Sequence, residues 1–340
     1  MSDYTVVALD AMGGDNAPGE MVKGAVDALN LNKDVKVILV GKEDTLKNEL
    51  SSYNYPTDRL EIKNATEVIE TAEHPVMAIK KKKDSSMVVG LHLVKEGVAD
   101  AFVSAGNSGA LLVGGLGIVG RIRGIERAPF GALIPTKNGV CLLADSGANV
   151  DCRSSHLVQF AKMGSIYMEK IIGIKNPRVA IVNNGAEEEK GNALVKETMP
   201  LLKECTDINF IGGIESRAIP AGEADVVICD GFVGNAILKT FEGVATTLID
   251  VIKEGLMSTT RSKIGAALAL PSLKSTLKAF DASNYGGAPL LGLNGLVVKT
   301  HGSAKANEVK NTIFQCVTFK EQNINELIRD NLIIEKKKED

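Results

Sequence analysis

The chain has 340 residues, enough for one large α/β domain or two smaller ones, and 44% of them are hydrophobic. A net charge of −3 and an aromatic content of 4% argue against a nucleic-acid-binding surface. The five cysteines are scattered without a CxxC pair, which indicates reduced thiols in the cytoplasm. We expect no signal peptide, and no apolar run approaches the roughly 18 residues of a membrane-spanning helix.

Short apolar runs alternate with helical patterns along the chain. The expected strands are 6–10, 35–40, 60–63, 101–103, 130–135, 140–145, 178–183, 208–211, 224–229 and 296–300. The expected helices are about 18–29, 43–50, 75–83, 85–95, 111–119, 154–172, 193–205, 236–256 and 305–332. Asn138-Gly139 between two of the strands is a strong hairpin signal. The alternation predicts an α/β fold with a doubly wound, mostly parallel sheet, in one domain over 1–335 or in two lobes.

Six loops rich in small and polar residues follow expected strands, at 11–16, 104–109, 145–151, 183–192, 230–235 and 301–303. In a doubly wound sheet the ligand binds outside the carboxyl ends of the strands, so we expect these loops on one sheet edge. In residues 104–110 the glycines allow a close backbone approach, and the following helix start offers N–H groups to an anion. The alternative is an ordinary capped turn, with Asn107 or Ser108 as the cap.

Residues 255–280 break the alternation of strands and helices. They contain no acidic residue but four basic ones, around an apolar centre at 264–273. We expect two helices that meet near Pro271 and protrude from the domain. They could pack in a dimer or in the core, or form a basic, apolar tip that contacts anionic lipid or an acidic carrier protein.

Other motifs are misleading in this chain. Residues 115–120 fit the dinucleotide pattern GxGxxG, but they lie in or after a helix and not between a strand and a helix. The chain has no GxxxxGK[ST] and no GxSxG. His301, Asp230 and a serine could be drawn as a triad, but their spacing does not favour one.

Residues 7–18, with the sequence VALDAMGGDNAP, resemble the opening signature of the bacterial phosphate acyltransferase (PlsX) family. The likeness continues through 104–110, 147–151, 187–192, 224–235, 239–243, 283–292 and 301–303, and covers about residues 5–330. It implies transfer of a long-chain acyl group from acyl carrier protein to inorganic phosphate, giving acyl phosphate for phospholipid synthesis. It also implies a fold like phosphate acetyltransferases and isocitrate dehydrogenase-like enzymes. We expect a homodimer, peripherally associated with the inner face of the cell membrane.

The chemistry of such a transfer suits the residues of the loops. Phosphate is already ionised near pH 7, and a thiol with a pKa of about 8.5 is a good leaving group. The site therefore has to position two anionic reactants and stabilise an oxyanion. On family motifs we predict that Lys190 neutralises phosphate or the oxyanion and that Asn235 hydrogen-bonds the same group. His301 could protonate the leaving sulfur or bind phosphate. The alternatives are a salt bridge from Lys190 to Glu187 or Glu189, a helix cap at Asn235 and a structural histidine.

The remaining predicted residues line the site and bind substrate. They are Asp10, Gly13, Gly14, Asp15, Asn16, Ser104, Asn107, Ser108, Asn149, Asp230 and Ser303. Asp15 could instead cap a helix. We expect neither a cofactor nor a metal, although the acids at 187–189 leave Mg²⁺ as an alternative. Two other functions stay open: an acyl-CoA-dependent phosphate acyltransferase, and a non-catalytic scaffold that binds acyl carrier protein and membrane.

Overall fold

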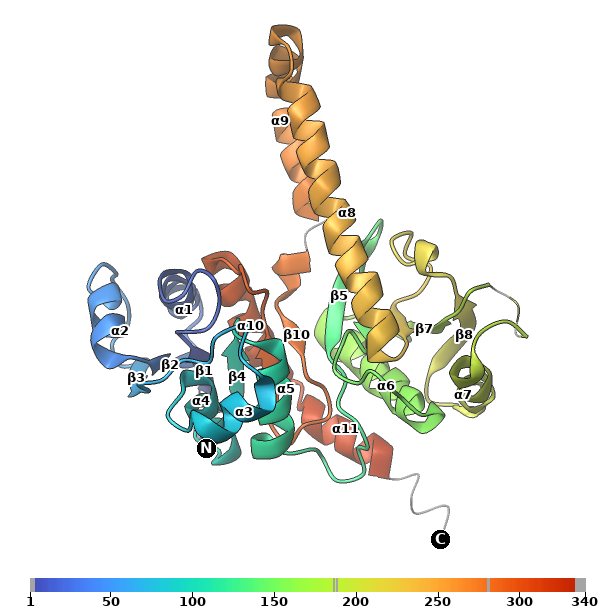
Figure 1. The fold of residues 1–340 in the computed structure, drawn as a ribbon, viewed down its shortest axis with the longest axis horizontal. Coiled ribbons are helices and arrows are strands. Elements are labelled where there is room, and N and C mark those ends of the chain that lie inside the picture. Colours follow the sequence, from blue (N-terminus) through green and yellow to red (C-terminus); the bar gives the residue numbers. More distant parts are fainter. Residues whose placement is uncertain (1–3, 186, 188, 280–281, 334–340) are drawn as a thin grey trace.

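The computed structural model describes residues 4–185, 187, 189–279 and 282–333. Within these ranges the strands form two sheets (Figure 1). The first has the order β10-β11-β4-β1-β2-β3, from β1 (Thr5–Asp10), β2 (Val35–Gly41), β3 (Leu60–Asn64), β4 (Ala101–Ser104), β10 (Ala288–Pro289) and β11 (Leu296–Lys299). The second has the order β5-β6-β9-β7-β8, from β5 (Gly131–Thr136), β6 (Gly139–Ala144), β7 (Arg178–Val182), β8 (Asn209–Ile214) and β9 (Val226–Ile228).

Most strand pairs are parallel, and the exceptions are β10 with β11 and β5 with β6. The β5–β6 pair is the hairpin predicted from Asn138-Gly139, with Thr136 opposite Gly139. All four residues of β4 are buried, as the continuous apolar run predicted for a strand covered on both faces. The predicted α/β fold with mostly parallel strands is confirmed.

Helices cover the sheets and connect the strands. They are α1 (Gly19–Leu31), α2 (Glu43–Leu50), α3 (Pro75–Lys81), α4 (Ser86–Lys95), α5 (Ser108–Gly114), α6 (Ser154–Tyr167), α7 (Ala193–Glu204), α8 (Gly231–Met257), α9 (Thr260–Ala279), α10 (Ala306–Glu321) and α11 (Ile324–Ile333). The predicted helices at 111–119 and 154–172 end in π-helical turns, Gly115–Val119 and Met168–Ile172. The GxGxxG pattern therefore lies in a helical turn, away from any strand-to-helix junction.

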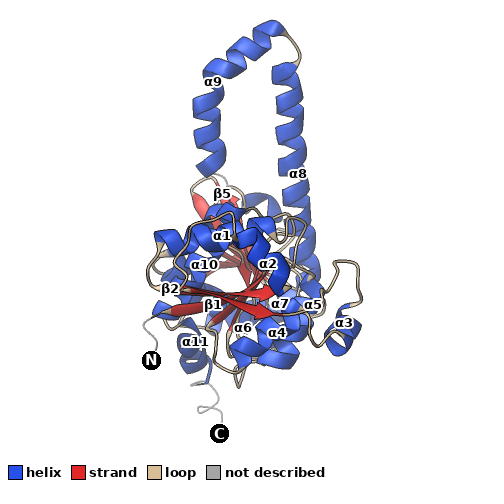
Figure 2. Cartoon of the chain, turned by 90° about the vertical axis from the view of Figure 1, so that its left-hand side faces the viewer, coloured by secondary structure: helices blue, strands red, loops and turns tan. Residues whose placement is uncertain are grey.

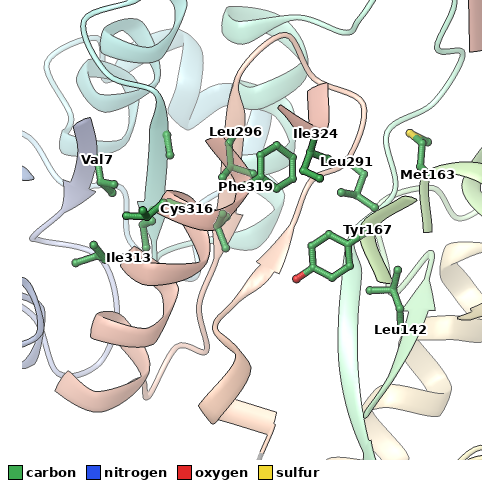
Figure 3. Packing of buried hydrophobic residues seen from close by; sticks show 14 of the residues in the cluster. Val7, Leu142, Met163, Tyr167, Leu291, Leu296, Ile313, Cys316, Phe319 and Ile324 are labelled. Atoms are coloured by element: carbon green, nitrogen blue, oxygen red, sulfur yellow. The ribbon is translucent and has the colours of Figure 1, made fainter. Parts of the chain in front are cut away.

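The two sheets share a hydrophobic core. One cluster of buried residues includes Val7 of the first sheet and Leu142 of the second, with Ile313 of α10 (Figure 3). Tyr167 of α6 is buried in the same cluster, and its hydroxyl accepts a hydrogen bond from Gln315 Nε2 of α10 at 2.6 Å. Because α10 follows β11 of the first sheet and α6 follows β6 of the second, this packing fixes the two sheets relative to each other.

Helices α8 and α9 project together from the rest of the protein (Figures 1 and 2). The predicted junction near Pro271 is wrong, since Pro271 lies inside α9 and the helices meet at Ser258 and Thr259. Thr259 Oγ1 accepts a hydrogen bond from the backbone N–H of Ser262 at 3.1 Å, so its hydroxyl caps the start of α9. No helix among the described residues is long and apolar enough to cross a membrane.

Candidate functional site

Three of the polar loops meet at one edge of the first sheet. They follow β1, β4 and β11, which are adjacent and parallel, so their carboxyl ends lie side by side. The backbone N–H of Asp15 donates to the Gly302 carbonyl at 2.8 Å. Asn16 Nδ2 donates to the Ser303 carbonyl at 2.9 Å. These bonds join the loops at 11–16 and 301–303, which are distant in sequence.

Glycines allow the loop after β1 to pack directly on the loop after β4. A Cβ atom on Gly13 would lie 2.4 Å from Asp10 Oδ2, and one on Gly14 would lie 2.7 Å from Ala105 Cβ. Gly14 also has a φ of +100°, a conformation that residues with side chains rarely adopt. The two glycines therefore allow a backbone packing that side chains would prevent, and their predicted contact with substrate stays a prediction.

Asp10 and Ser104 form a buried pair beneath these loops. Ser104 Oγ donates to Asp10 Oδ2 at 2.7 Å and accepts a hydrogen bond from the backbone N–H of Gly106 at 3.0 Å. Burial raises the pKa of Asp10, while its hydrogen bonds oppose the rise. Both side chains are fully enclosed, with 1% and 0% exposed. The predicted substrate contact is therefore corrected: this pair holds the loop backbones in place.

His301 and Ser303 lie at the surface of the same edge. His301 Nδ1 accepts a hydrogen bond from the Ser303 backbone N–H at 3.2 Å and lies 2.7 Å from Ser303 Oγ. Because Nδ1 is an acceptor in this arrangement, the neutral ring carries its proton on Nε2. Both side chains are exposed, so the imidazole N–H is available to a bound group.

Asn107 has a different role from the one predicted. Its Oδ1 accepts the Ala110 backbone N–H at 2.9 Å and caps α5. Its Nδ2 donates to backbone carbonyls of the segment before α3, including Thr71 and Glu73, both at 3.0 Å. The amide is buried and fully bonded, so it fastens two loops together and is not free to hold a ligand. Ser108 beside it is exposed.

Lys299, at the end of β11, is a site residue that the sequence reasoning missed. Its Nζ donates to the Ala105 carbonyl at 3.1 Å and to the Thr300 carbonyl. Its pKa is lowered to about 8, mainly by burial and in part by Lys239 of α8, while Glu308, Asp10 and Asp15 oppose the shift. A largely buried ammonium thus lies among the loops of the first sheet edge.

The lowered pKa of Lys299 predicts a pH-dependent stability. In the unfolded chain the pKa of this lysine is about 10.4, whereas in the folded protein it is about 8. Between these values the unfolded chain binds more protons, so stability rises with pH, by up to about 3 kcal/mol. We expect the Lys299→Met variant to lack this rise. Denaturant unfolding from pH 7.5 to 10.5 measures it, and parallel pH curves for both proteins would refute the assignment.

The other three loops lie at one edge of the second sheet. They follow β6, β9 and β7, which are adjacent and parallel. The buried Asp145 organises the loop after β6 by accepting backbone N–H groups of Gly147, Ala148 and Asn149 at 2.6–3.1 Å. Asn149 Nδ2 donates to Asp145 Oδ2 and to the Ala128 carbonyl. The predicted substrate contact of Asn149 is therefore corrected, because its buried amide braces the loop.

Asp230 and Asn235 lie at the start of α8. Asp230 Oδ1 accepts the Val233 backbone N–H at 2.9 Å, so Asp230 is the helix cap. Asn235 lies inside the helix, which excludes the cap alternative for it, and its side chain is exposed. A Cβ atom on Gly147 would lie 3.5 Å from the Asn235 side chain, so Asn235 stands directly over the loop after β6.

Lys190 lies on the loop after β7, before α7 begins. Its Nζ is 2.8 Å from Glu187 Oε2, which is the salt bridge considered as the alternative. The hydrogen bond that Lys190 donates to the Glu187 carboxylate raises the pKa of Lys190, so the ammonium stays charged at neutral pH. Both side chains are about half exposed. An ammonium has three donors, and Glu187 leaves part of this capacity for an anionic ligand.

Six loops therefore occupy two sheet edges, and not one as predicted. Among the described residues, no hydrogen bond joins a predicted residue of one edge to one of the other. The influence of Lys239 on Lys299 places α8 within electrostatic range of the first edge. The described residues contain no group of three or more His, Cys, Asp or Glu side chains arranged to hold a metal.

A family profile described as "Fatty acid synthesis protein" matches residues 5–327. The phosphate acyltransferase of Clostridium tetani (strain Massachusetts / E88) is 49% identical over 327 residues, covering 96% of this chain and 98% of that protein. The chain belongs to the phosphate acyltransferase family. The resemblance drawn from residues 7–18 and the later motifs is thereby confirmed, and the protein is an acyltransferase.

Solved structures place this phosphate acyltransferase family member in a wider fold group. A phosphotransacetylase from Streptococcus pyogenes superposes with a TM-score of 0.60 at 19% identity, covering 94% of this chain and 95% of that one. The EutD phosphotransacetylase from Staphylococcus aureus gives 0.59 at 18% identity, covering 93% and 94%. At such identities the likeness concerns the fold, and it confirms the expected similarity to phosphate acetyltransferases.

Proposed function

We propose that the protein transfers a long-chain acyl group from acyl carrier protein to inorganic phosphate, forming an acyl phosphate for phospholipid synthesis. Family membership supports an acyl transfer to phosphate. The observation that carries the proposal further is the second sheet edge. There, an exposed ammonium on the loop after β7 and an exposed amide on α8 follow neighbouring parallel strands.

The proposed reaction is a direct displacement. A phosphate oxygen forms a bond to the thioester carbonyl carbon, the C–S bond breaks, and the sulfur leaves with its electron pair and takes up a proton. Lys190 would neutralise the phosphate or the developing oxyanion, and the Asn235 amide would donate to the same group. The Nε2–H of His301 is the proposed hydrogen-bond donor to the departing sulfur, and the released thiolate takes its proton from water.

Four of the five cysteines do not favour a covalent acyl-enzyme. Burial raises the pKa of Cys152 to about 12 and also raises the pKa of Cys141, Cys229 and Cys316. These residues are held as thiols at neutral pH, whereas nucleophilic attack requires a thiolate. Phosphate itself is therefore the better nucleophile in this proposal.

The α8–α9 hairpin supports two further proposals. Exposed Val244, Leu248, Val251 and Ile252 lie at helical spacing along α8, an apolar stripe that we assign to a second copy of the chain in a homodimer. Toward the far end, Ile264, Leu268 and Leu270 are exposed on a segment without acidic residues. We assign this tip to peripheral contact with the anionic inner face of the cell membrane.

The acyl donor can be tested by a thiol-release assay with two thioesters compared side by side. One is acylated acyl carrier protein and the other is acyl-CoA, and both bear the same acyl chain. We expect phosphate-dependent release from the carrier protein at a higher kcat/KM. Preference for acyl-CoA would favour the alternative enzyme, and no release from either would favour the non-catalytic scaffold.

A further inference from the structure

A cleft of about 500 Å³ lies between the segment before β5 and the start of α6. Three arginines line it, Arg121, Arg127 and Arg153, together with Glu126 and His156. None of the residues predicted for the acyl transfer belongs to this lining. The cleft therefore needs an explanation of its own.

The single carboxylate of this lining is engaged by α6. His156 Nε2 lies 3.1 Å from Glu126 Oε2, and Ser155 Oγ donates to the same oxygen at 3.2 Å. His156 Nδ1 accepts the Arg153 backbone N–H at 3.1 Å, so Nε2 carries the proton of the neutral ring. The carboxylate of Glu126 is thus held by α6, while its backbone carbonyl accepts a hydrogen bond from the Arg121 guanidinium.

In the described part of the chain, two of the three arginines of the cleft lack a carboxylate partner. Among the residues that the structure describes, no carboxylate forms an ion pair with Arg127 or Arg153. Burial lowers the pKa of His156, both arginines lower it further, and Glu126 opposes them. Two guanidinium charges therefore act on the His156 ring, and an anion bound beside that ring would relieve the repulsion between the two guanidinium groups.

We propose that this cleft binds a phosphate group through Arg127 and Arg153, with Arg121 at its rim. Guanidinium groups match phosphate oxygens in paired, charge-assisted hydrogen bonds. The cleft is wide open to solvent, so its volume of about 500 Å³ leaves room for a phosphate alone or for one attached to a larger group.

The position of the cleft links it to the second sheet edge. Ala128, next to Arg127, accepts a hydrogen bond from Asn149 of the loop after β6, and Arg153 lies two residues beyond the end of that loop. The phosphate could be inorganic phosphate, or the phosphate of the prosthetic arm that carries the acyl thioester. The second source rests on the proposed carrier-protein donor.

Calorimetric titration with three probes tests the proposal: inorganic phosphate, 4′-phosphopantetheine, and pantetheine without its phosphate. For the Arg127→Gln/Arg153→Gln variant we expect phosphate-dependent affinity to fall about ten-fold or more. The Arg123→Gln variant should bind like the wild type, because Arg123 is exposed on the same segment but outside the lining. Circular dichroism checks that the variants fold.

The three probes separate the two sources. Loss of affinity for 4′-phosphopantetheine identifies the prosthetic arm, and loss for inorganic phosphate alone identifies the free anion. Equal affinity of wild type and double variant for both phosphate-bearing probes overturns the proposal, as does no binding of either to the wild type. These titrations need no acyl transfer, so their failure is distinct from failure of the proposed function.

Discussion

Replacing Lys190 by alanine is expected to lower kcat by about 100- to 1,000-fold while the protein stays folded. This is the range for removing one group that stabilises an oxyanion in acyl transfer. Lys190 is about half exposed, and its ion pair with Glu187 lies within its own loop, so its loss should not affect the core. Steady-state kinetics and thermal unfolding measure the two effects. Near-normal turnover of the variant would contradict the assignment.

Two control variants separate a chemical role of Lys190 from a structural one. Lys196→Ala removes an exposed lysine from the next helix and should leave kcat unchanged. Glu187→Gln removes the ion pair but keeps the ammonium, so it should retain most of the activity. If Glu187→Gln lost as much activity as Lys190→Ala, the ion pair and not the ammonium would be what the enzyme needs.

The Leu268→Glu/Leu270→Glu variant is expected to bind vesicles containing anionic lipid about 100-fold more weakly than the wild type. Burying one leucine contributes about 1.5–3 kcal/mol, and the new carboxylates would also be repelled by the lipid headgroups. Leu268 is 80% exposed and Leu270 47%, so the substitutions should not destabilise the fold. Vesicle sedimentation measures the partition.

The matched control for vesicle binding is Leu31→Glu/Leu201→Glu. These leucines are also exposed, at 69% and 40%, but they belong to α1 and α7, away from the hairpin. This variant has the same change of charge and should bind vesicles like the wild type. Unchanged vesicle binding of the tip variant would exclude the lipid assignment and leave the tip to another partner.

The strands and most helices could be predicted because their signals are local. Continuous apolar runs such as β4 indicate buried parallel strands, and Asn138-Gly139 marks a hairpin. The division into two sheets could not be predicted, since β4 and β9 are equally apolar and neither run specifies its neighbour. Proline usually disrupts a helix, so Pro271 in the α8–α9 hairpin suggested a junction there. Instead, Pro271 lies inside α9, and the hydroxyl of Thr259 caps the start of that helix.

Individual site residues were harder to predict because their partners are distant in sequence. Asn107 and Asn149 are polar loop residues of the type that binds ligands, yet their amides bond backbone carbonyls near residues 71 and 128. Lys299 was missed for the opposite reason. A lysine at the end of an apolar run is typical of a solvated strand end, and only the packed loops after β1 and β4 reveal its burial.

The central claim, direct attack of phosphate on the carrier-bound thioester, is tested by incubating the enzyme with acylated acyl carrier protein in the absence of phosphate. The account predicts no thiol release and no acyl adduct on the protein by mass spectrometry. Adding phosphate should then release one thiol for each acyl phosphate formed. A burst of thiol without phosphate, equal to the enzyme concentration and accompanied by an acylated protein, would contradict the account.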